Sequence, residues 1–256
     1  MAIELSIIKN SKGNLNKILS FSPERKLNKK ASANLYLGEV KVIDVDSMLD
    51  LARAISSLES NEALILGVPF FQNTLVKYSK VGSKNHIEKN NLKNYLERSK
   101  KIFRYRFGFP AFLLFDIDDS SETPSVVWDR LCSIDSRLSG CGYVVSHSST
   151  SFIYDKDGNE LQGAGGLHFY IPVKDGSDIE RYGKSFARKS WLLGLGHIKI
   201  AKQGAFLVRQ IIDDAVFTPE RIVFEALPSL TDGLIQKKPE VISVEGCLLD
   251  TSIFTL

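Results

Sequence analysis

Two aspartates at the end of an apolar segment are the residues best suited to chemistry. The sequence FLLFDIDD places Asp116 and Asp118 two residues apart, directly after the apolar run 111–115. Because alternate residues of a β-strand share one face, both carboxylates should project to the same side. Two close negative charges repel unless a cation lies between them, and oxygen ligands suit Mg²⁺ or Mn²⁺. The spacing predicts a divalent-cation site; the alternative is a strand end whose acids cap the next helix.

A second pair of aspartates serves as an internal control for this interpretation. Asp44 and Asp46 have the same spacing, but they lead directly into Ser47 and Asp50, which match the capping box of a helix. At this second pair we therefore favour a purely structural role.

Other candidate groups lie further along the chain. His168, in GGLHFYIP, lies on a predicted strand, on the face opposite Leu167 and Phe169. A histidine there is either a packed structural residue or a functional group that titrates near neutral pH. Arg209 and Asp213 are four residues apart and share a face if the strand that contains Arg209 continues. An ion pair is the ordinary interpretation of these two.

Basic residues are concentrated in one segment, although the net charge is only +3. The basic stretch from Lys77 to Arg106 contains ten Lys or Arg residues and two acids. Aromatic residues are interleaved with these bases, so the stretch could follow a phosphate backbone while its rings stack on bases. The alternative is a solvated helical face. We predict DNA contacts from the following residues: Lys93, Arg98, Lys100, Lys101, Arg104 and Arg106.

The composition is that of a globular protein. Of the 256 residues, 43% are hydrophobic and 25% are charged, which excludes a disordered chain. No apolar run approaches the roughly 20 residues needed to span a bilayer, and the first residues lack the apolar core of a signal peptide. We expect a cytoplasmic protein with no membrane partner. Three cysteines are too few and too scattered for a disulfide framework or a zinc site, so no zinc is expected.

The elements that must position these groups alternate irregularly. Apolar runs, helix caps and turn residues predict strands at 40–45, 63–68, 111–115, 143–146 and 166–173, and helices at 48–58, 124–138 and 177–191. A hairpin is expected from 197–201 and 205–209, and a polar loop at 150–165. The hairpin is inconsistent with a purely parallel sheet, so we predict an α+β (mixed αβ) fold.

Four segments, in this order, resemble the archaeo-eukaryotic primase superfamily, in particular the primase-polymerase domains of plasmid, phage and mobile-element replication proteins. They are the strand ending in Asp116 and Asp118, the sequence VVSHSS at 144–149, the Gly-Gly-x-His-x-Tyr strand at 165–170, and the Arg-x-x-x-Asp element at 209–213. The resemblance covers about residues 110–226. One departure is Gly166, which stands where relatives often have a serine two residues before the histidine.

The resemblance implies a two-metal site for nucleotidyl transfer. Asp116, Asp118 and Asp213 would hold two Mg²⁺ or Mn²⁺ ions, which clamp the attacking and leaving oxygens of an in-line displacement. His168 would contact the phosphates of the incoming nucleotide. Further contacts to the triphosphate are implied for these residues: Ser148, Ser149, Lys199, Lys202 and Arg209.

The resemblance also implies a fold, namely a primase-like catalytic core whose mixed sheet has an RRM-like part flanked by helices. We expect a single primase-polymerase domain over residues 1–256. Within it, residues 1–107 would form an N-terminal αβ part that carries the basic stretch, 108–226 the catalytic core and 227–256 a C-terminal extension.

These expectations describe a DNA primase-polymerase that synthesises primers on single-stranded DNA from nucleoside triphosphates during replication of a mobile genetic element. A replicative helicase, fused or separate, is a further expected partner. Two alternatives remain open. A haloacid-dehalogenase-like phosphatase would use Asp116 and Asp118 as nucleophile and acid, Ser146 as phosphate ligand, and Asp213 with Asp214 as the metal pair. A non-catalytic nucleic-acid-binding module would bind nucleic acid without turnover.

Overall fold

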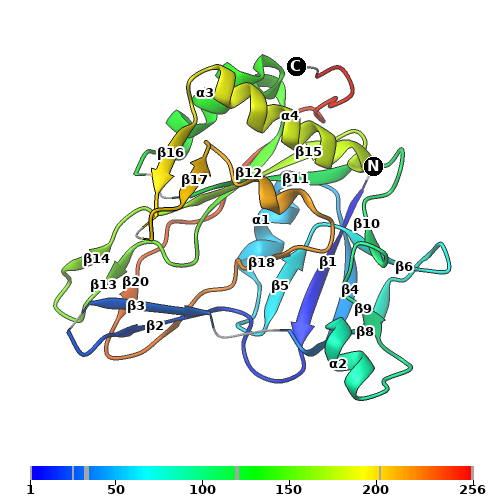
Figure 1. Ribbon diagram of the computed structural model, residues 1–256, viewed down its shortest axis with the longest axis horizontal. Helices are drawn as coiled ribbons and strands as arrows, with labels where there is room; N and C mark the ends of the chain where they lie inside the picture. Colours follow the sequence, from blue (N-terminus) through cyan, green and yellow to red (C-terminus); the bar gives the residue numbers. More distant parts are fainter. Residues whose placement is uncertain (1, 25, 32–34, 119–120, 202, 255–256) are drawn as a thin grey trace.

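The computed structural model describes residues 2–24, 26–31, 35–118, 121–201 and 203–254. It is a mixed α+β structure with several sheets, as the sequence predicts (Figure 1). None of the helices in these ranges combines the length and the apolar character that crossing a bilayer requires.

The first half of the chain builds a six-stranded sheet, here called the N-terminal sheet. Its centre is an antiparallel pair, β1 with β4, in register from Ile3 opposite Val45 to Asn10 opposite Gly38. The strand order is β18-β5-β1-β4-β8-β9. The bounds are β1 Ile3–Asn10, β4 Leu37–Val45, β5 Glu62–Ile65, β8 Tyr78–Gly82, β9 Leu96–Glu97 and β18 Ile222–Val223. The last of these strands is contributed from far along the chain.

A four-stranded antiparallel sheet, here called the central sheet, carries the residues singled out for chemistry. Its order is β11-β15-β12-β21, with bounds β11 Ala111–Ile117, β12 Tyr143–His147, β15 Leu167–Val173 and β21 Ile242–Val244. Up to residue 192, the strands of this sheet and the helices packed on it follow one another in the order β11, α3 (Pro124–Ile134), β12, β15 and α4 (Ile179–Leu192), with two short strands of another sheet between β12 and β15. The strand that is third in this succession therefore pairs between the first and the second.

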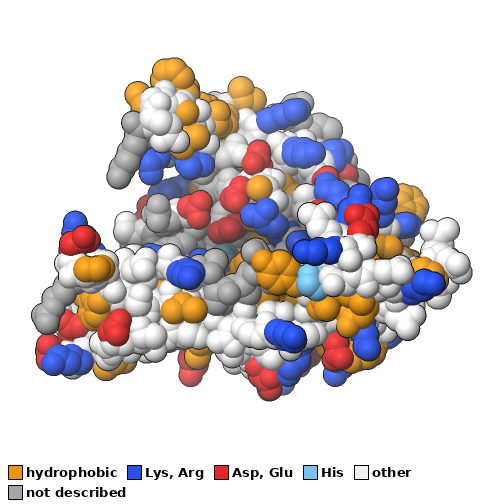
Figure 2. All heavy atoms as spheres, turned by 60° about the horizontal axis from the view of Figure 1, so that its bottom comes forward, with side chains coloured by type: hydrophobic (Ala, Val, Ile, Leu, Met, Phe, Trp, Pro, Cys, Tyr) orange, Lys and Arg blue, Asp and Glu red, His pale blue; other side chains and the backbone are white. Residues whose placement is uncertain are grey.

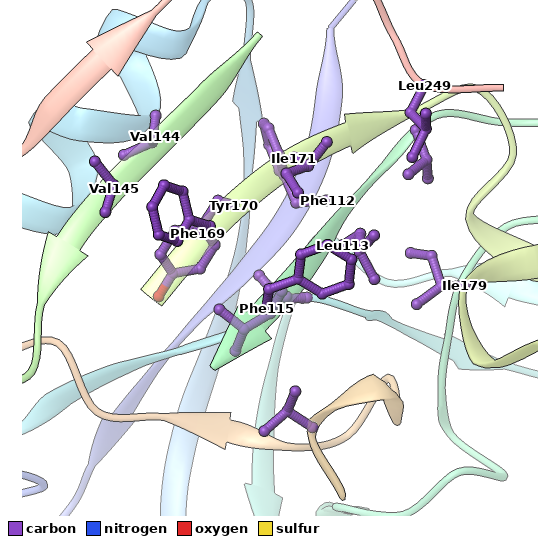
Figure 3. Close-up of a cluster of buried hydrophobic side chains, with 14 of the residues drawn as sticks. Phe112, Leu113, Phe115, Val144, Val145, Phe169, Tyr170, Ile171, Ile179 and Leu249 are labelled. Atoms are coloured by element: carbon purple, nitrogen blue, oxygen red, sulfur yellow. The ribbon is translucent and has the colours of Figure 1, made fainter. Parts of the chain in front are cut away.

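Helices α3 and α4 cover one face of the central sheet through aromatic side chains (Figure 1). The Phe115 ring centroid lies 4.5 Å from that of Phe186 on α4. On α3, Trp128 lies with its ring centroid 4.1 Å from that of Tyr143 and 5.6 Å from that of Phe169. Figure 3 shows side chains of β11 and β15 packed in this core.

The opposite face of the central sheet is also buried, because the N-terminal sheet and helix α1 (Met48–Ser56) share its core. Leu5 belongs to the same apolar cluster as Phe112 and Leu114. The predicted alternation in β15 is correct, since His168 and Tyr170 lie on the face opposite Phe169. However, that face is covered too, and Tyr170 is fully buried.

Smaller sheets complete the fold. A three-stranded sheet contains β2 Lys17–Phe21, β3 Leu27–Ala31 and β19 Ser229–Leu230, and another contains β13 Ile153–Tyr154, β14 Glu160–Gln162 and β20 Ile235–Gln236. A third contains β6 Val68–Phe71, β7 Thr74–Leu75 and β10 Phe103–Arg104. The predicted hairpin is present as β16 His197–Ile200 and β17 Phe206–Arg209, and helix α2 spans Lys84–Lys89.

Several predicted boundaries are wrong for local reasons. The helix expected to reach residue 138 ends at Ile134, because Asp135 has an extended backbone, and a 3₁₀ turn follows. Asp178, rather than Ser177, precedes α4 as its N-cap. The expected loop at 150–165 contains β13 and β14. By contrast, Ser47 caps α1 as predicted, since its hydroxyl accepts a hydrogen bond from the backbone N–H of Asp50.

Candidate active site

The central sheet aligns Asp116, His168 and Ser146 in one row across three strands. Asp116 of β11 lies opposite His168 of β15, and Ser146 of β12 lies opposite the same histidine. Directly opposed residues of paired strands project to the same face. The His168 Nε2 atom lies 3.5 Å from Asp116 Oδ1. Residues that are up to 52 positions apart in the sequence are therefore neighbours because of strand register.

Asp213 is held next to Asp116 by a backbone hydrogen bond. Its N–H donates a hydrogen bond of 2.8 Å to the carbonyl oxygen of Asp116, immediately beyond the central sheet. Its own carboxylate accepts a hydrogen bond of 2.9 Å from the N–H of Ala215 and so caps a 3₁₀ turn at 214–217. Strand β17 ends at Arg209, so the expectation that one continuing strand carries both Arg209 and Asp213 is wrong.

The negative charges of Asp118 and Asp213 act on the carboxyl group of Asp116. Burial raises the pKa of Asp116 above its ordinary value, and the negative charges of Asp118 and Asp213 raise it further, although His168 opposes this. A carboxyl group with a raised pKa holds its negative charge at a cost in free energy. A bound cation would remove that cost.

The donor set fits a hard divalent cation in type and in charge. In the part of the chain that the structure describes, no three His, Cys, Asp or Glu side chains form a group that could hold a metal ion, so Asp116, Asp118 and Asp213 are not assembled as a three-carboxylate site. Mg²⁺ in nucleotide-dependent enzymes is commonly held by one or two carboxylates together with waters and substrate phosphates. Asp116, Asp118 and Asp213 are the residues that would supply those carboxylates.

A buried glutamate, which the sequence analysis did not single out, accepts hydrogen bonds from residues of the row that contains Ser146 and His168. Glu225 is fully buried, and its Oε1 lies 2.5 Å from Nδ1 of His168. It also accepts hydrogen bonds from the Tyr170 hydroxyl at 2.6 Å and from the Ser146 hydroxyl at 2.8 Å. Its Oε2 atom, which accepts the Ser146 bond, also lies 3.7 Å from the Nζ atom of Lys238, whose side chain is 8% exposed.

These contacts set the charges of both Glu225 and His168. Burial alone would raise the pKa of Glu225, but His168 and Lys238 outweigh it and lower that pKa to about 2. Burial would lower the pKa of His168, but Glu225 and Asp116 raise it above 6.5. These contacts favour the imidazolium form of His168. Because Nδ1 faces Glu225, the Nε2–H is left to face Asp116 and any ligand beside it.

The pH dependence of stability should reveal this pair. The pKa of Glu225 is about 2 in the folded protein and near 4.5 in the unfolded chain. Its contribution to the unfolding free energy is therefore fully present above pH 4.5 and is lost as the pH falls towards 2. The pKa of His168 is raised in the folded protein, so this residue stabilises the fold below pH 6.5. That stabilisation is lost as the pH rises through the pKa of His168 in the folded protein. The difference in unfolding free energy between wild type and Glu225→Gln, measured with urea, should be largest between pH 4.5 and 6.5. A difference that does not change with pH would contradict the ion pair.

A basic cavity opens beside this row. It has a volume of about 370 Å³ and its wall includes Asp116, His168 and three cationic side chains, namely Lys17, Arg98 and Arg221. We call it the imidazole cavity. Figure 2 shows a hollow on one face of the molecule in which acidic and basic side chains gather.

The β16–β17 hairpin borders a second cavity, of about 380 Å³, on the Asp118 side. Asp118 and Asp213 line it together with His197, Lys199 and Arg209 of the hairpin. Lys199 and Arg209, which the resemblance implies as triphosphate contacts, therefore share a cavity with two of the predicted metal ligands. Lys202 lies outside the described residues.

The two predicted serines are placed less favourably. Ser149 is 2% exposed, and its hydroxyl has no hydrogen-bond partner among the described residues. The Ser148 hydroxyl lies 3.5 Å from that of Thr150. Neither residue lines the two cavities described above.

The basic stretch is not one helical face, because β8, α2, β9 and β10 divide it. Three of the predicted DNA contacts have other partners: Arg98, in the wall of the imidazole cavity, donates a hydrogen bond of 3.0 Å to the backbone oxygen of Glu220, Lys100 pairs with Glu180 at 3.0 Å, and Arg106 pairs with Glu4 at 2.5 Å. For the other three, Lys93, Lys101 and Arg104, the described residues provide no acidic partner within ion-pair distance.

No protein-family model matches the chain, and comparison with curated proteins and with solved structures finds no significant match. Its function is therefore inferred from the site itself.

Proposed function

We propose that the chain is a DNA primase-polymerase that joins nucleotides on a single-stranded DNA template by two-metal nucleotidyl transfer. The observation that carries this proposal is the position of Asp116. This residue lies among acids on one side, with Asp118 and Asp213 raising its pKa, and it borders the imidazole cavity on the other side. A nucleoside triphosphate needs both environments, metal-binding acids and a cationic pocket, within a few ångströms.

Each group would have a distinct task in the reaction. Asp116, Asp118 and Asp213 would hold the metal ions. When bound, two such ions activate the attacking 3′-hydroxyl and neutralise the departing pyrophosphate. The imidazolium of His168 would donate its Nε2–H to a phosphate oxygen, because a charged donor makes the stronger hydrogen bond. Lys17, Arg98 and Arg221 would offset the remaining negative charge of the triphosphate.

The topology supports the same proposal. The succession β11, α3, β12, β15 and α4, with β15 paired between β11 and β12, is compatible with the RRM-like part that the primase resemblance implies, and the fourth strand, β21, lies beside β12. The primase core, the mobile-element context and the helicase partner remain proposals based on that resemblance.

The two alternatives have less support. The phosphatase expects repeated βα units, which produce parallel strands, whereas all pairs in the central sheet are antiparallel. Its phosphate ligand, Ser146, donates its hydroxyl hydrogen to Glu225 instead. A binding module without catalysis would have no need to hold Asp116 at a raised pKa beside two other acids.

Incorporation of labelled nucleotides on single-stranded DNA, with and without a primer, tests the proposal. The wild-type protein with Mg²⁺ or Mn²⁺ should extend or start chains in a template-dependent way, and the double variant Asp116→Asn, Asp118→Asn should not. Phosphate release from small esters without synthesis would identify the phosphatase. DNA binding without either reaction would identify the binding module.

Cation binding should be detectable without turnover. Millimolar Mn²⁺ or Mg²⁺ should raise the Tm, because a cation removes the repulsion among the acids only in the folded protein. A concentration of 100 times the Kd would add about 2.7 kcal/mol, or roughly 5–10 °C for a chain of this size. Asp118→Asn should reduce the shift. An equal shift in the double variant Asp116→Asn, Asp118→Asn would place the cation elsewhere.

Replacing His168 should mainly affect nucleotide affinity. His168→Gln retains a hydrogen-bond donor but loses the positive charge, so the apparent KM for nucleotide should rise about tenfold or more with a smaller change in kcat. Steady-state kinetics with nucleotide as the varied substrate measures both constants, and a Tm measurement checks folding. An unchanged KM would exclude His168 from the nucleotide site.

A further inference from the structure

A pocket with aromatic walls lies outside the active site, at the other end of β11. Its volume is about 340 Å³, and its wall includes Phe70, Phe107 and Phe109 together with Asn73, Arg104 and Arg106. We call it the Phe107 pocket. Phe109 lies just before β11, whereas Asp116 lies near the end of that strand. The five residue steps of strand from Ala111 to Asp116 place the two regions about 17 Å apart or more.

The rings of this pocket are exposed and partly held in place. The Phe107 side chain is 84% exposed and that of Phe109 is 43% exposed. The Arg106 guanidinium lies 3.6 Å from the Phe109 ring centroid, and its ion pair with Glu4 fixes it there. Scattered exposed rings are ordinary, but three rings around one pocket form a surface on which a flat ligand can stack.

The charge around the pocket is positive and only partly neutralised. Arg104 donates hydrogen bonds to the backbone oxygen of Lys101 and to the side chain of Asn73, so its own partners are uncharged. No acid of the described residues pairs with Arg104 or with the exposed Lys101. The Arg104 guanidinium also lies 6.0 Å from the Phe70 ring centroid. Aromatic faces with adjacent uncompensated cations complement a strand of stacked bases joined by phosphates.

We infer that the Phe107 pocket binds an unpaired base of single-stranded DNA, with Arg104 and Lys101 contacting the adjacent phosphates. The strand is the template of the reaction proposed above, and in this respect the inference rests on that proposed function. The pocket would hold template bases outside the active site, beyond the opposite end of β11. Base stacking accepts any sequence, because every base has an aromatic face.

Equilibrium binding of a dye-labelled oligothymidylate, followed by fluorescence anisotropy, tests the inference. An abasic oligonucleotide of the same length supplies the same phosphates without bases. Phe107→Ala should weaken binding of the oligothymidylate roughly tenfold and leave binding of the abasic strand unchanged. Phe71→Ala is the matched control: Phe71 is 53% exposed on the neighbouring strand β6 but does not line the pocket, so its variant should bind like wild type.

The phosphate contacts give a second readout. Arg104→Ala should weaken binding of both the oligothymidylate and the abasic oligonucleotide. It should also make the affinity less dependent on salt concentration. Equal affinities of wild type and Phe107→Ala for the oligothymidylate would overturn the inference, as would preferential displacement of the oligothymidylate by single-stranded RNA. Because these assays need no catalysis, the two proposals can fail separately. Synthesis with no effect of Phe107→Ala rejects only the pocket, whereas base-dependent binding without synthesis rejects only the polymerase.

Discussion

Asp116→Asn should reduce template-directed nucleotide incorporation by about a thousandfold or more while leaving the protein folded. Removing one carboxylate from a two-metal site weakens stabilisation of the reacting oxygens by several kcal/mol, and each 1.36 kcal/mol corresponds to a factor of ten in rate. The fold should tolerate the change, because Asp116 already has a raised pKa from burial and from its acidic neighbours. We therefore expect the Tm without metal to be unchanged or higher. Single-turnover incorporation and thermal unfolding measure the two effects.

Asp46→Asn provides the matched control. Asp46 belongs to the other pair of aspartates with the same spacing, which precedes helix α1. Its partner in that pair, Asp44, forms an exposed ion pair of 2.9 Å with Lys77. Incorporation by Asp46→Asn should equal that of wild type. Substantial incorporation by Asp116→Asn, with the protein folded, would contradict the assignment of the metal site.

Replacing Glu225 should have the largest effect on stability. Glu225→Leu removes the acceptor for His168, Tyr170 and Ser146 and leaves the Lys238 charge buried. Removing one partner of a buried ion pair typically costs about 3–5 kcal/mol, or roughly 6–20 °C in Tm for a chain of this size. Urea unfolding at pH 6 gives the free energy, and unfolding must be two-state for the comparison to hold.

A control variant and a double-mutant cycle distinguish the effect of the Glu225–His168 ion pair from a general effect of replacing a glutamate. Glu240→Leu replaces an exposed glutamate from the segment after Lys238 and should change the unfolding free energy by less than about 0.5 kcal/mol. A double-mutant cycle with Glu225→Gln and His168→Gln should give a coupling energy well above that of an exposed pair, which is at most about 1 kcal/mol. Additive effects would mean that the two side chains do not stabilise one another.

Local sequence patterns predicted the parts of the site that depend on one strand. The apolar run before Asp116 and the alternation around His168 each specify a strand and a face. The two-residue period of a strand fixes which side chains share a face, so both predictions needed only neighbouring residues. The hairpin was predicted for the same reason, since its turn lies between two short runs.

Patterns of this kind could not identify the partners of those residues. Glu225 follows the strand β18 and reaches His168 because two sheets pack together, and no periodicity encodes that contact. The available signal was a single acid between apolar residues in IVFEAL, which favours burial with a partner but does not name it. Lys17 and Arg221 join one cavity from positions about 200 residues apart, so only the fold could bring them together.

The composition of the basic stretch could not predict which of its side chains are exposed in the folded protein. Its charge suggested one continuous surface, but Arg98 lines the imidazole cavity and Phe103 is fully buried in the core. Tyr78, at 59% exposure, and Phe107, at 84%, are exposed enough to stack on bases, and of these two only Phe107 lines the pocket described above. The sequence identifies the basic region, whereas the structure shows which of its side chains are exposed and could contact DNA.

The short segment that follows Pro219 connects the two large sheets of the molecule. Its strand β18 pairs with β5 in the N-terminal sheet, while Glu225, two residues beyond Val223, bonds to His168 in the central sheet. Separating the two sheets would break that bond and remove the strongest contact between two buried, oppositely charged groups. We therefore expect the two sheets to stay together during the proposed reaction. The β16–β17 hairpin, in contrast, forms a sheet of its own and is not tied to either large sheet by strand pairing.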